Sequence, residues 1–435
     1  MLGRRGSGIS LLPLLMVNFI GTLGFSIVLP FLVFLVDRFG GNSIIYGIIG
    51  ATYPVFQLVG APVLGRWSDI YGRKKILFLS QLGTLLSWFI FLIALLIPIT
   101  TLRDIDNNIL GSFTLTVPLL ILFVARALDG ITGGNVSVAN AYLADITSEE
   151  DRSKNYGWMS VTTNLGLIVG PALASILSAI SYQYLSPVVA AIIISFTGTL
   201  VILFIVPESR KCIYQFEDKT NLKDVFGYEQ RECGGYSSGG EKVEKIGFKR
   251  ILKINHIPYV LLLYFFIFLG FNIFYTAFPL HALNLLEWQV SDMGLYFTVL
   301  SSMMMFVEGP VLSKAAKVYS DSFLVVIGSF VLGINFLLLV TGSEILTYIA
   351  AIFFAVGNGL MWPSVLSILS KFAGPKYQGA VQGFAGSFMS LASIAGLIFG
   401  GFLYGYLSTG TFFISAVIIY SVFVLSFRLL GFKKS

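Results

Sequence analysis

Three charged residues lie inside segments that are otherwise apolar. Arg126 and Asp129 lie in the run 115–144, and Glu308 lies in the run 291–313. A charge in the middle of a membrane helix costs about 2.5 kcal/mol or more, so it normally faces a cavity or a partner. Arg126 and Asp129 are three residues apart and can share one helix face. All three are candidates for proton coupling, because a carboxylate in such a place, Asp129 or Glu308, can take up and release a proton and a cation such as Arg126 can tune it. A purely structural ion pair is the alternative for Arg126 and Asp129.

A second concentration of charge lies between two apolar runs, in the sequence G-R-W-S-D-I-Y-G-R-K-K that begins at Gly65. Gly65 and Gly72 permit close helix approach and a sharp turn. Asp69 and Arg73 are four residues apart, and a carboxylate there can also interact with the N-terminus of a neighbouring helix. The spacing predicts a structured turn at the membrane edge. The simpler alternative is a turn whose positive charge only fixes the topology.

A third pattern is made of small residues. Gly166 and Gly170 are four apart within an apolar run, and Pro171 follows directly. Small residues at this spacing form a groove for close helix packing, and a proline bends the helix. A packing face without further function is the alternative interpretation.

The elements that must position these residues are membrane helices. The chain has 435 residues, of which 56% are hydrophobic and 11% charged, and its mean hydropathy is +0.85. A soluble protein carries roughly a quarter charged residues. Each span needs about 20 apolar residues. Twelve such runs are predicted, over 10–36, 44–64, 75–98, 115–144, 156–180, 185–206, 256–283, 291–313, 321–342, 345–370, 378–406 and 410–430.

The long polar segment 207–255 divides these runs into six and six. We therefore expect an N-terminal bundle over 1–206, a linker over 207–255 and a C-terminal bundle over 256–435. With the N-terminus inside, 25 of the 28 Lys and Arg residues fall on the inner side or in the linker. The positive-inside rule then predicts a multi-pass cell-membrane protein whose two termini and linker are cytoplasmic.

The two halves resemble each other in sequence. The segment P-V-L-G-R-W-S-D-I-Y at 62–71 aligns with P-V-L-S-K-A-A-K-V-Y at 310–319. The segment G-L-I-V-G-P-A-L at 166–173 aligns with G-L-I-F-G-G-F-L at 396–403. Both matches fall in equivalent spans of the two halves. This predicts an internal repeat of the kind from which many transporters are built.

Several classes of function are excluded. No G-x4-G-K-[ST] or H-E-x-x-H motif occurs, and the only histidines are His256 and His281. We therefore expect no enzyme activity, no cofactor and no metal site. The positive residues lie between the apolar runs rather than on a basic stripe, so we expect no nucleic-acid partner.

The motifs resemble those of the major facilitator superfamily. The stretch from Gly65 to Lys74 is similar to its loop signature G-x-x-x-D-x-x-G-R-K, and R-A-L-D-G-I-T-G-G from Arg126 is similar to its signature in the fourth span. The resemblance implies an all-α fold of twelve transmembrane helices in two pseudo-symmetric six-helix bundles around a central cavity. It also implies that Gly65, Asp69, Gly72 and Arg73 form a cytoplasmic gate, and that the protein is a monomer.

Two further stretches resemble the tetracycline and multidrug proton-antiporter branch of that family. In A-Y-L-A-D-I-T from Ala141, the resemblance makes Asp145 the partner of Arg73, with a simple helix-end acid as the alternative. The sequence G-L-I-V-G-P, with Gly166, Gly170 and Pro171, is similar to the antiporter signature of the fifth span.

In this family the first, fourth, seventh and tenth spans line the cavity. The candidates here are Phe25, Asn140, Phe271, Phe274, Tyr275, Asn358 and Trp362. An aromatic lining with few charges favours amphipathic or lipophilic solutes. Our leading hypothesis is proton-coupled efflux of such small organic compounds by alternating access. The alternatives are uniport or symport of a small metabolite or sugar, and a membrane receptor or scaffold that transports nothing.

Overall fold

The computed structural model describes residues 10–133, 135–147, 152–180, 184–209, 254 and 256–432, without the side chains of Asp69, 135–137, 152–154, Ile180 and 374–380. Most of the linker 207–255 lies outside these residues. The described N-terminal elements are α1 (Leu12–Ser26), α2 (Leu32–Arg38), α3 (Ser43–Tyr71), α4 (Arg73–Leu96), β1 (Thr101–Asn107), β2 (Gly111–Thr116), α5 (Val117–Thr132), α6 (Asn135–Ile146), α7 (Arg152–Ile180) and α8 (Leu185–Phe204). The C-terminal elements are α11 (Ile257–Asn284), α12 (Val290–Phe306), η1 (Val307–Val311), α13 (Leu312–Val318), α14 (Asp321–Leu339), α15 (Glu344–Leu407), α16 (Gly410–Ser426) and η2 (Phe427–Gly431).

The expected all-α membrane fold is confirmed. Within the described ranges, ten helical segments are long and apolar enough to cross a membrane. The two remaining expected spans, 10–36 and 115–144, are each built from two shorter helices, α1 with α2 and α5 with α6. The first break contains Pro30, which lacks the backbone N–H that a continuous helix would use. The second break begins at Gly133.

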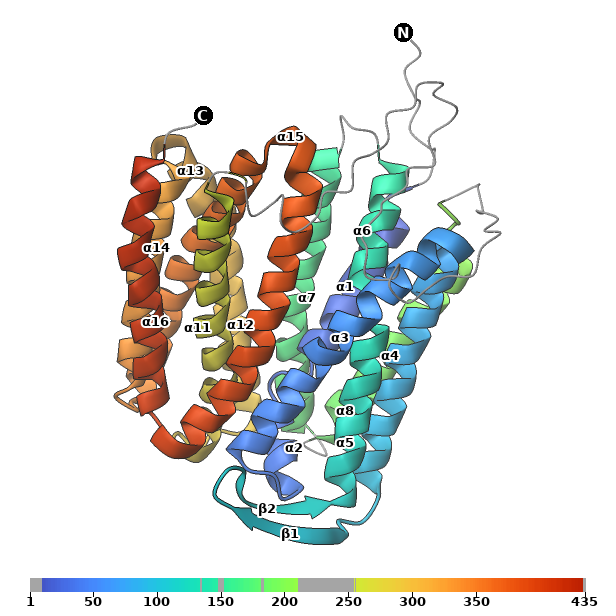
Figure 1. Ribbon diagram of the computed structural model, residues 1–435. Helices are drawn as coiled ribbons and strands as arrows, with labels where there is room; N and C mark the ends of the chain where they lie inside the picture. Colours follow the sequence, from blue (N-terminus) through green and yellow to red (C-terminus); the bar gives the residue numbers. More distant parts are fainter. Residues whose placement is uncertain are drawn as a thin grey trace.

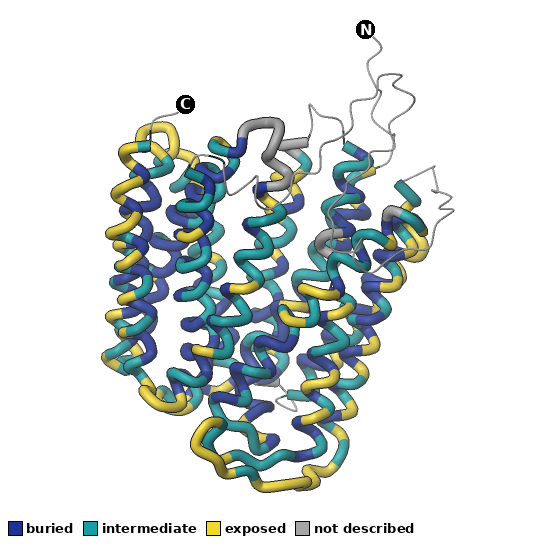
Figure 2. The backbone as a smooth tube through the Cα atoms, viewed as in Figure 1, coloured by how far each residue is buried: buried dark blue, intermediate teal, exposed yellow. Residues whose placement is uncertain are grey.

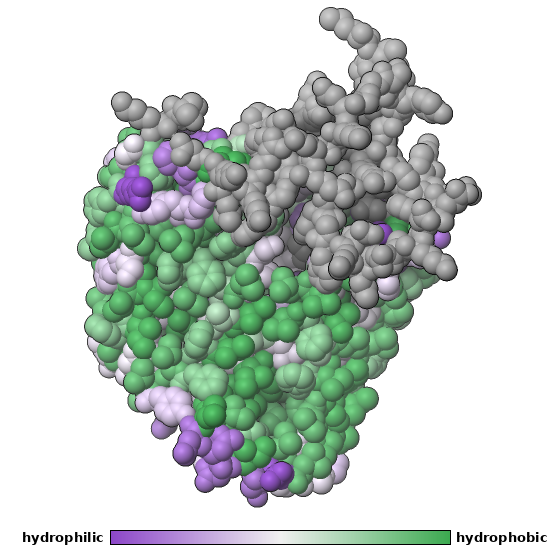
Figure 3. Space-filling view, in the orientation of Figure 1, coloured by the Kyte–Doolittle hydropathy of each residue, from purple (hydrophilic) through white to green (hydrophobic). Residues whose placement is uncertain are grey.

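The helices form two side-by-side bundles, with α1 to α8 in one and α11 to α16 in the other (Figure 1). Buried residues line the facing sides of the helices within each bundle (Figure 2). A broad hydrophobic surface separates two more polar ends of the molecule (Figure 3). We call the end with β1 and β2 the hairpin face. The opposite end, where α1 begins and η2 ends, is the terminal face.

The repeat seen in the sequence has a direct meaning in the packing. A methyl group on Gly166 would lie 3.0 Å from the backbone nitrogen of Leu23, so α7 packs closely on α1. The same group on Gly396 would lie 2.9 Å from the carbonyl oxygen of Leu269, so the second part of α15 packs equally closely on α11. In each half, therefore, the matching glycine segment packs its helix against the equivalent neighbouring helix.

The two bundles contact each other near the hairpin face. A Cβ atom on Gly401 would lie 2.5 Å from the Ser43 carbonyl oxygen and 3.0 Å from the Gly47 Cα, so α15 touches the backbone of α3. On the other side of the interface, the Ser175 hydroxyl of α7 donates a hydrogen bond of 2.7 Å to the Ser291 carbonyl of α12. We call these two contacts the α3–α15 seam and the α7–α12 seam.

The bundles diverge toward the terminal face. A Cβ atom on Gly157, Gly309 or Gly383 would have no described neighbour within 4 Å. These glycines lie in the parts of α7, η1 and α15 nearest the terminal face, where Figure 1 shows the helices of the two halves spreading apart. The molecule is therefore closed at the hairpin face and spread at the terminal face.

The sequence analysis did not anticipate the β-hairpin. β1 pairs antiparallel with β2, and the Asn107 side chain accepts a hydrogen bond from the Leu110 N–H in the turn between them. The Thr114 N–H donates to the Gly40 carbonyl (2.9 Å), which holds the hairpin on the α2–α3 turn. The Tyr406 hydroxyl at the end of α15 donates to the Asn108 carbonyl (2.7 Å). The hairpin therefore touches both halves.

Candidate functional site

The charged pair in the fourth span is buried inside the N-terminal half. The Arg126 Nη1 lies 3.4 Å from the Asp129 Oδ2, and the two side chains are 8% and 14% exposed. The guanidinium also lies over the Tyr53 ring, 5.1 Å from its centroid. Its Nε is buried without a hydrogen-bond partner in the described part of the chain. Asp129 therefore has a cation beside it, whereas the donors of Arg126 are only partly used.

Close contact between α3 and α5 fixes this pair. A Cβ atom on Gly130 would lie 2.5 Å from the Tyr53 carbonyl oxygen, so only a glycine permits this approach. Gln57 donates hydrogen bonds to the Gly133 carbonyl (2.9 Å) and to the Tyr53 hydroxyl (3.1 Å). These contacts satisfy the backbone where α5 ends and hold Tyr53 against Arg126. The pair belongs to one half and does not cross between the halves.

Glu308 has a different setting, because it lies between the halves. It is in η1, a π-helical turn that contains Pro310, and such turns are common at functional sites. Asn164 of α7 lies 3.5 Å from its Oε2. On the other side, a Cβ atom on Gly359 of α15 would lie 3.6 Å from the Glu308 Cγ. Among the described residues, Glu308 has no ion-pair partner.

The charges near the terminal face form a compact cluster. The Arg73 Nε lies 2.9 Å from the Asp145 Oδ2, with side-chain exposures of only 5% and 18%. The Arg73 Nη1 donates to the Ser68 hydroxyl (2.5 Å), and that hydroxyl donates to the Gly65 carbonyl (2.6 Å). The cluster links the end of α3, the start of α4 and the end of α6. The Asp69 side chain lies outside the described residues.

Sequence reasoning missed one member of this cluster, Glu208. Its carboxylate accepts hydrogen bonds from the Arg73 N–H (2.8 Å) and the Lys74 N–H (3.2 Å), so it caps the N-terminus of α4. Gly72 has a φ of 102°, and a Cβ atom there would lie 2.5 Å from the Glu208 Oε2. The available signal was an acid directly after the sixth apolar run, on the same side as the basic turn.

Gly170 and Pro171, predicted as an antiporter-type motif, lie where α7 meets two neighbours. A Cβ atom on Gly170 would collide with the Ser26 side chain and lie 2.9 Å from the Ile27 N–H nitrogen. The Pro171 carbonyl oxygen faces the other half, 2.7 Å from a Cβ atom placed on Gly294. The motif thus packs α7 on α1 and on α12 at once.

Aromatic residues predicted for the cavity group together in the C-terminal half. The Phe271 and Tyr275 rings lie 4.6 Å apart between centroids, and the Trp362 ring lies 4.2 Å from that of Phe268. Phe271, Tyr275 and Trp362 are all partly exposed. They could therefore offer ring surface to a solute.

Phe274 is placed differently from what we expected of a lining residue. It is fully buried, and its ring packs 4.9 Å from Phe354 and 5.7 Å from Phe336 of α14. It faces the interior of its own bundle, because Phe274 and Tyr275 are adjacent in α11 and successive residues point about 100° apart around a helix. In this conformation it offers no surface to a solute.

The remaining predicted lining residues are more scattered. Phe25 is 38% exposed and packs 5.5 Å from Tyr53, and Asn140 is partly exposed in α6. Asn358 is buried, and its Oδ1 has no hydrogen-bond partner in the described part of the chain.

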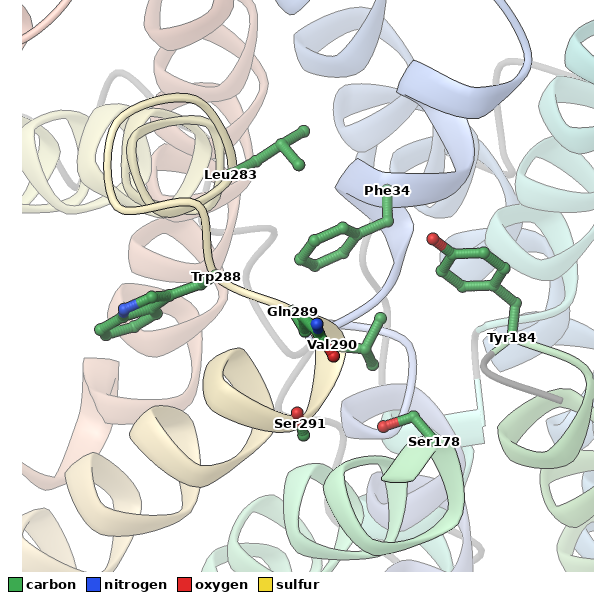
Figure 4. Close-up of a pocket in the computed structure, with 8 residues that line it drawn as sticks. All are labelled: Phe34, Ser178, Tyr184, Leu283, Trp288, Gln289, Val290 and Ser291. Atoms are coloured by element: carbon green, nitrogen blue, oxygen red, sulfur yellow. The ribbon is translucent and has the colours of Figure 1, made fainter. Parts of the chain in front are cut away.

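Two cavities open between the halves near the hairpin face. One, of ≈ 230 Å³, has walls from both halves, including Phe34 and Tyr184 on one side and Leu283 and Trp288 on the other (Figure 4). The other, of ≈ 440 Å³, lies between α2, α3, α11 and α15 and includes Asp37 and Asn284. None of the residues predicted for the central cavity lines either one.

Comparison with known proteins gives consistent results. The model of the Major Facilitator Superfamily matches residues 14–385 and 260–434. The tetracycline resistance protein, class H, of Pasteurella multocida is 26% identical over 91% of this chain and 89% of its own length. Multidrug resistance protein 1 of Bacillus subtilis is 25% identical over 90% of this chain and 89% of its own. The crystal structure of a D-xylose-proton symporter has a TM-score of 0.73 at 13% identity and covers 96% of both chains, which supports the fold alone.

Proposed function

The chain belongs to the major facilitator superfamily, and we propose that it exports amphipathic or lipophilic organic compounds in exchange for protons. The observation that carries this proposal is the arrangement of the two halves. They touch through backbone contacts at the hairpin face and spread at the terminal face, as one state of an alternating-access cycle would. The tetracycline and multidrug resistance relatives, which align along almost the whole chain, support efflux rather than uptake.

We infer that the terminal face is cytoplasmic. Most of the basic residues that flank the spans lie at this end, including Arg73, Lys314 and Lys371, whereas Arg38 and Arg103 lie at the hairpin face. Under that orientation the structure is the inward-facing state, in which a solute enters from the cytoplasm and leaves after the hairpin face opens. We also propose that the protein acts as a monomer made of bundles 1–206 and 256–435, joined by the linker 207–255.

The proton site is best assigned to Glu308. Asp129 pairs with Arg126 within one half, so rocking of the halves need not change this contact. Glu308 instead faces the neutral Asn164 across the interface between the halves. Rocking of the halves must change that contact, so the protonation of Glu308 and the conformational state can influence each other. Arg126 and Asp129 then act as a fixed polar pair beneath Tyr53.

The cluster around Arg73 fits a gate that closes the terminal face. Arg73 and Asp145 hold the α3–α4 turn on the end of α6, and Glu208 orders the first turn of α4. A rigid turn can present Asp69 to the opposite half when the terminal face closes. We retain Gly65, Asp69, Gly72, Arg73 and Asp145 as the gate and add Glu208 to it.

Reconstituted transport tests the proposal. Proteoliposomes made acidic inside should accumulate a fluorescent lipophilic dye or tetracycline, and a protonophore should abolish the accumulation. Glu308→Gln should remove the dependence on the pH gradient but leave dye exchange between equal pH values intact, because only the proton site is lost. Asp129→Asn should impair folding or rate without selective loss of coupling.

Other outcomes would point elsewhere. Gradient-independent uptake of a sugar or small metabolite with no movement of either drug would favour a uniporter. Loss of a cellular phenotype on shortening the 207–255 linker, with no transport by the intact protein, would favour a receptor or scaffold. Unchanged pH dependence in Glu308→Gln would remove Glu308 from the mechanism and leave the transport proposal standing.

A further inference from the structure

A second ion pair, with one mostly buried and one exposed partner, lies at the terminal face in the C-terminal half. The Asp321 Oδ2 accepts hydrogen bonds from the Lys371 ammonium and from the Ser367 hydroxyl, the latter at 2.6 Å. Asp321 is the first residue of α14, where the helix N-terminus also favours a negative charge. Its side chain is 17% exposed, while that of Lys371 is 52% exposed. The pair joins the start of α14 to the terminal-face end of the tenth span within α15.

The internal repeat places this pair opposite the Arg73 cluster. The aligned segments 62–71 and 310–319 differ by 248 in residue number, and the same offset takes Arg73 to Asp321. Both residues begin the helix that follows the turn, α4 in one half and α14 in the other. Their partners correspond as well, because Asp145 and Lys371 lie at the terminal-face ends of the fourth and tenth spans.

We propose that Asp321 and Lys371 are positioning residues, the counterpart of Arg73 and Asp145 with the two charges exchanged. In the N-terminal half the cation is on the helix start and the acid is on the neighbouring span. In the C-terminal half the acid is on the helix start and the cation is on the span. Each pair thus fixes, at the terminal face of its half, the junction between the start of one helix and the end of the neighbouring span. We call this junction the corner, and it moves with its half as one body.

A serine also contacts each pair, Ser68 from the end of α3 and Ser367 from the tenth span within α15. The Ser68 hydroxyl accepts a hydrogen bond from Arg73, whereas the Ser367 hydroxyl donates one to Asp321. A hydroxyl can do either, so it serves an ion pair of either polarity. In both halves, therefore, the residue at the helix start has two side-chain partners. The two ion pairs thus occupy equivalent places with opposite charge, as a positioning role allows, because the attraction between the partners matters and the sign on each one does not.

Charge exchange tests the inference. The variants are Asp321→Lys, Lys371→Asp and the double variant that carries both, with Lys317→Asp as a matched control. Lys317 is exposed on the same face, in α13, and has no ion-pair partner among the described residues. Two readouts are needed. The first is hydrogen exchange of the purified protein. The second is the rate of pH-driven dye transport in proteoliposomes, divided by the amount of reconstituted protein that binds dye.

Hydrogen exchange reports on the corner without any reference to transport. In Lys371→Asp, the backbone amides of 314–325 should lose protection from exchange. In Asp321→Lys, the amides of 365–373 should lose protection. Each loss is thus expected around the partner of the changed residue. The double variant should regain both, and Lys317→Asp should change neither. Protection that is unaffected in the single variants, or that the double variant does not regain, would overturn the proposal.

Transport reports on the consequence for the cycle and rests on the proposed function. Each single variant should transport dye about threefold to tenfold more slowly with dye affinity unchanged, and the double variant should recover. Single variants with normal rates but altered exchange would limit the pair to a structural role and would also overturn the positioning proposal. If the unaltered protein moves no dye, the proposed function fails, and the exchange results still decide whether the pair fixes the corner.

Discussion

At the scale of single residues, position 72 excludes a side chain for two separate reasons. Its φ of 102° lies in a region that residues with a Cβ atom rarely adopt, and the space beside it is filled by the Glu208 carboxylate. The sequence predicted the turn and its glycine. It could not predict Glu208, because the contact joins residues separated by more than 130 positions and depends on how α8 ends beside α4.

Gly72→Ala should therefore destabilise the protein. We expect the free energy of unfolding to fall by about 1–3 kcal/mol, because the backbone strain and the displaced carboxylate act together. Thermal unfolding in detergent measures the change. Gly157→Ala is the control, since a Cβ atom there has no described neighbour within 4 Å and the change should not lower the free energy of unfolding. Equal behaviour of the two variants would contradict this account of the turn.

At the scale of elements, the glycine pairs show how far sequence reasoning extends. The match between 166–173 and 396–403 predicted equivalent helices, and the structure gives each segment the same neighbour in its own half. The sequence pattern could not predict which helix that neighbour would be. Nor did it predict the β-hairpin, whose strands carry no regular apolar alternation and depend on contacts with Gly40 and Tyr406 for their position.

Gly170→Ala should separate α7 from α1. Its new methyl group would meet the Ser26 hydroxyl and the backbone of Leu23, and overpacking of this kind costs about 1–3 kcal/mol. Combining it with Ser26→Ala should restore only part of the stability, because the backbone contacts remain. Thermal unfolding of the two single variants and the double variant gives the comparison. Full recovery in the double variant would show that the side chain alone limits the approach.

At the scale of the whole molecule, the two seams determine which face is closed. Both are formed at backbone distance by small residues, Gly47 with Gly401 in one seam and Ser175 with Gly294 in the other. Such contacts are lost as a unit when two rigid halves rock apart, because they contain no long side chain that could stretch across a gap. The sequence predicted two bundles, but the conformational state became visible only from these distances.

Gly401→Ala should shift the population toward a state that is open at the hairpin face, because its Cβ atom would meet the Ser43 carbonyl oxygen. A cysteine at Leu280, which is buried beside the larger cavity, can report this in a background with Cys212 and Cys233 replaced. Its alkylation by a membrane-impermeant maleimide should become faster in Gly401→Ala. Gly386→Ala, on the same helix with no described neighbour near its Cβ atom, should leave the rate unchanged.

The β-hairpin also has a practical consequence. Asn108 at its tip and Tyr406 on the opposite half are bonded to each other and form one composite surface, which exists only while the hairpin face is closed. An antibody fragment selected against this surface would distinguish the two conformations. Its binding would trap the transporter in one of them and would report, in intact cells, how often the cycle passes through the other.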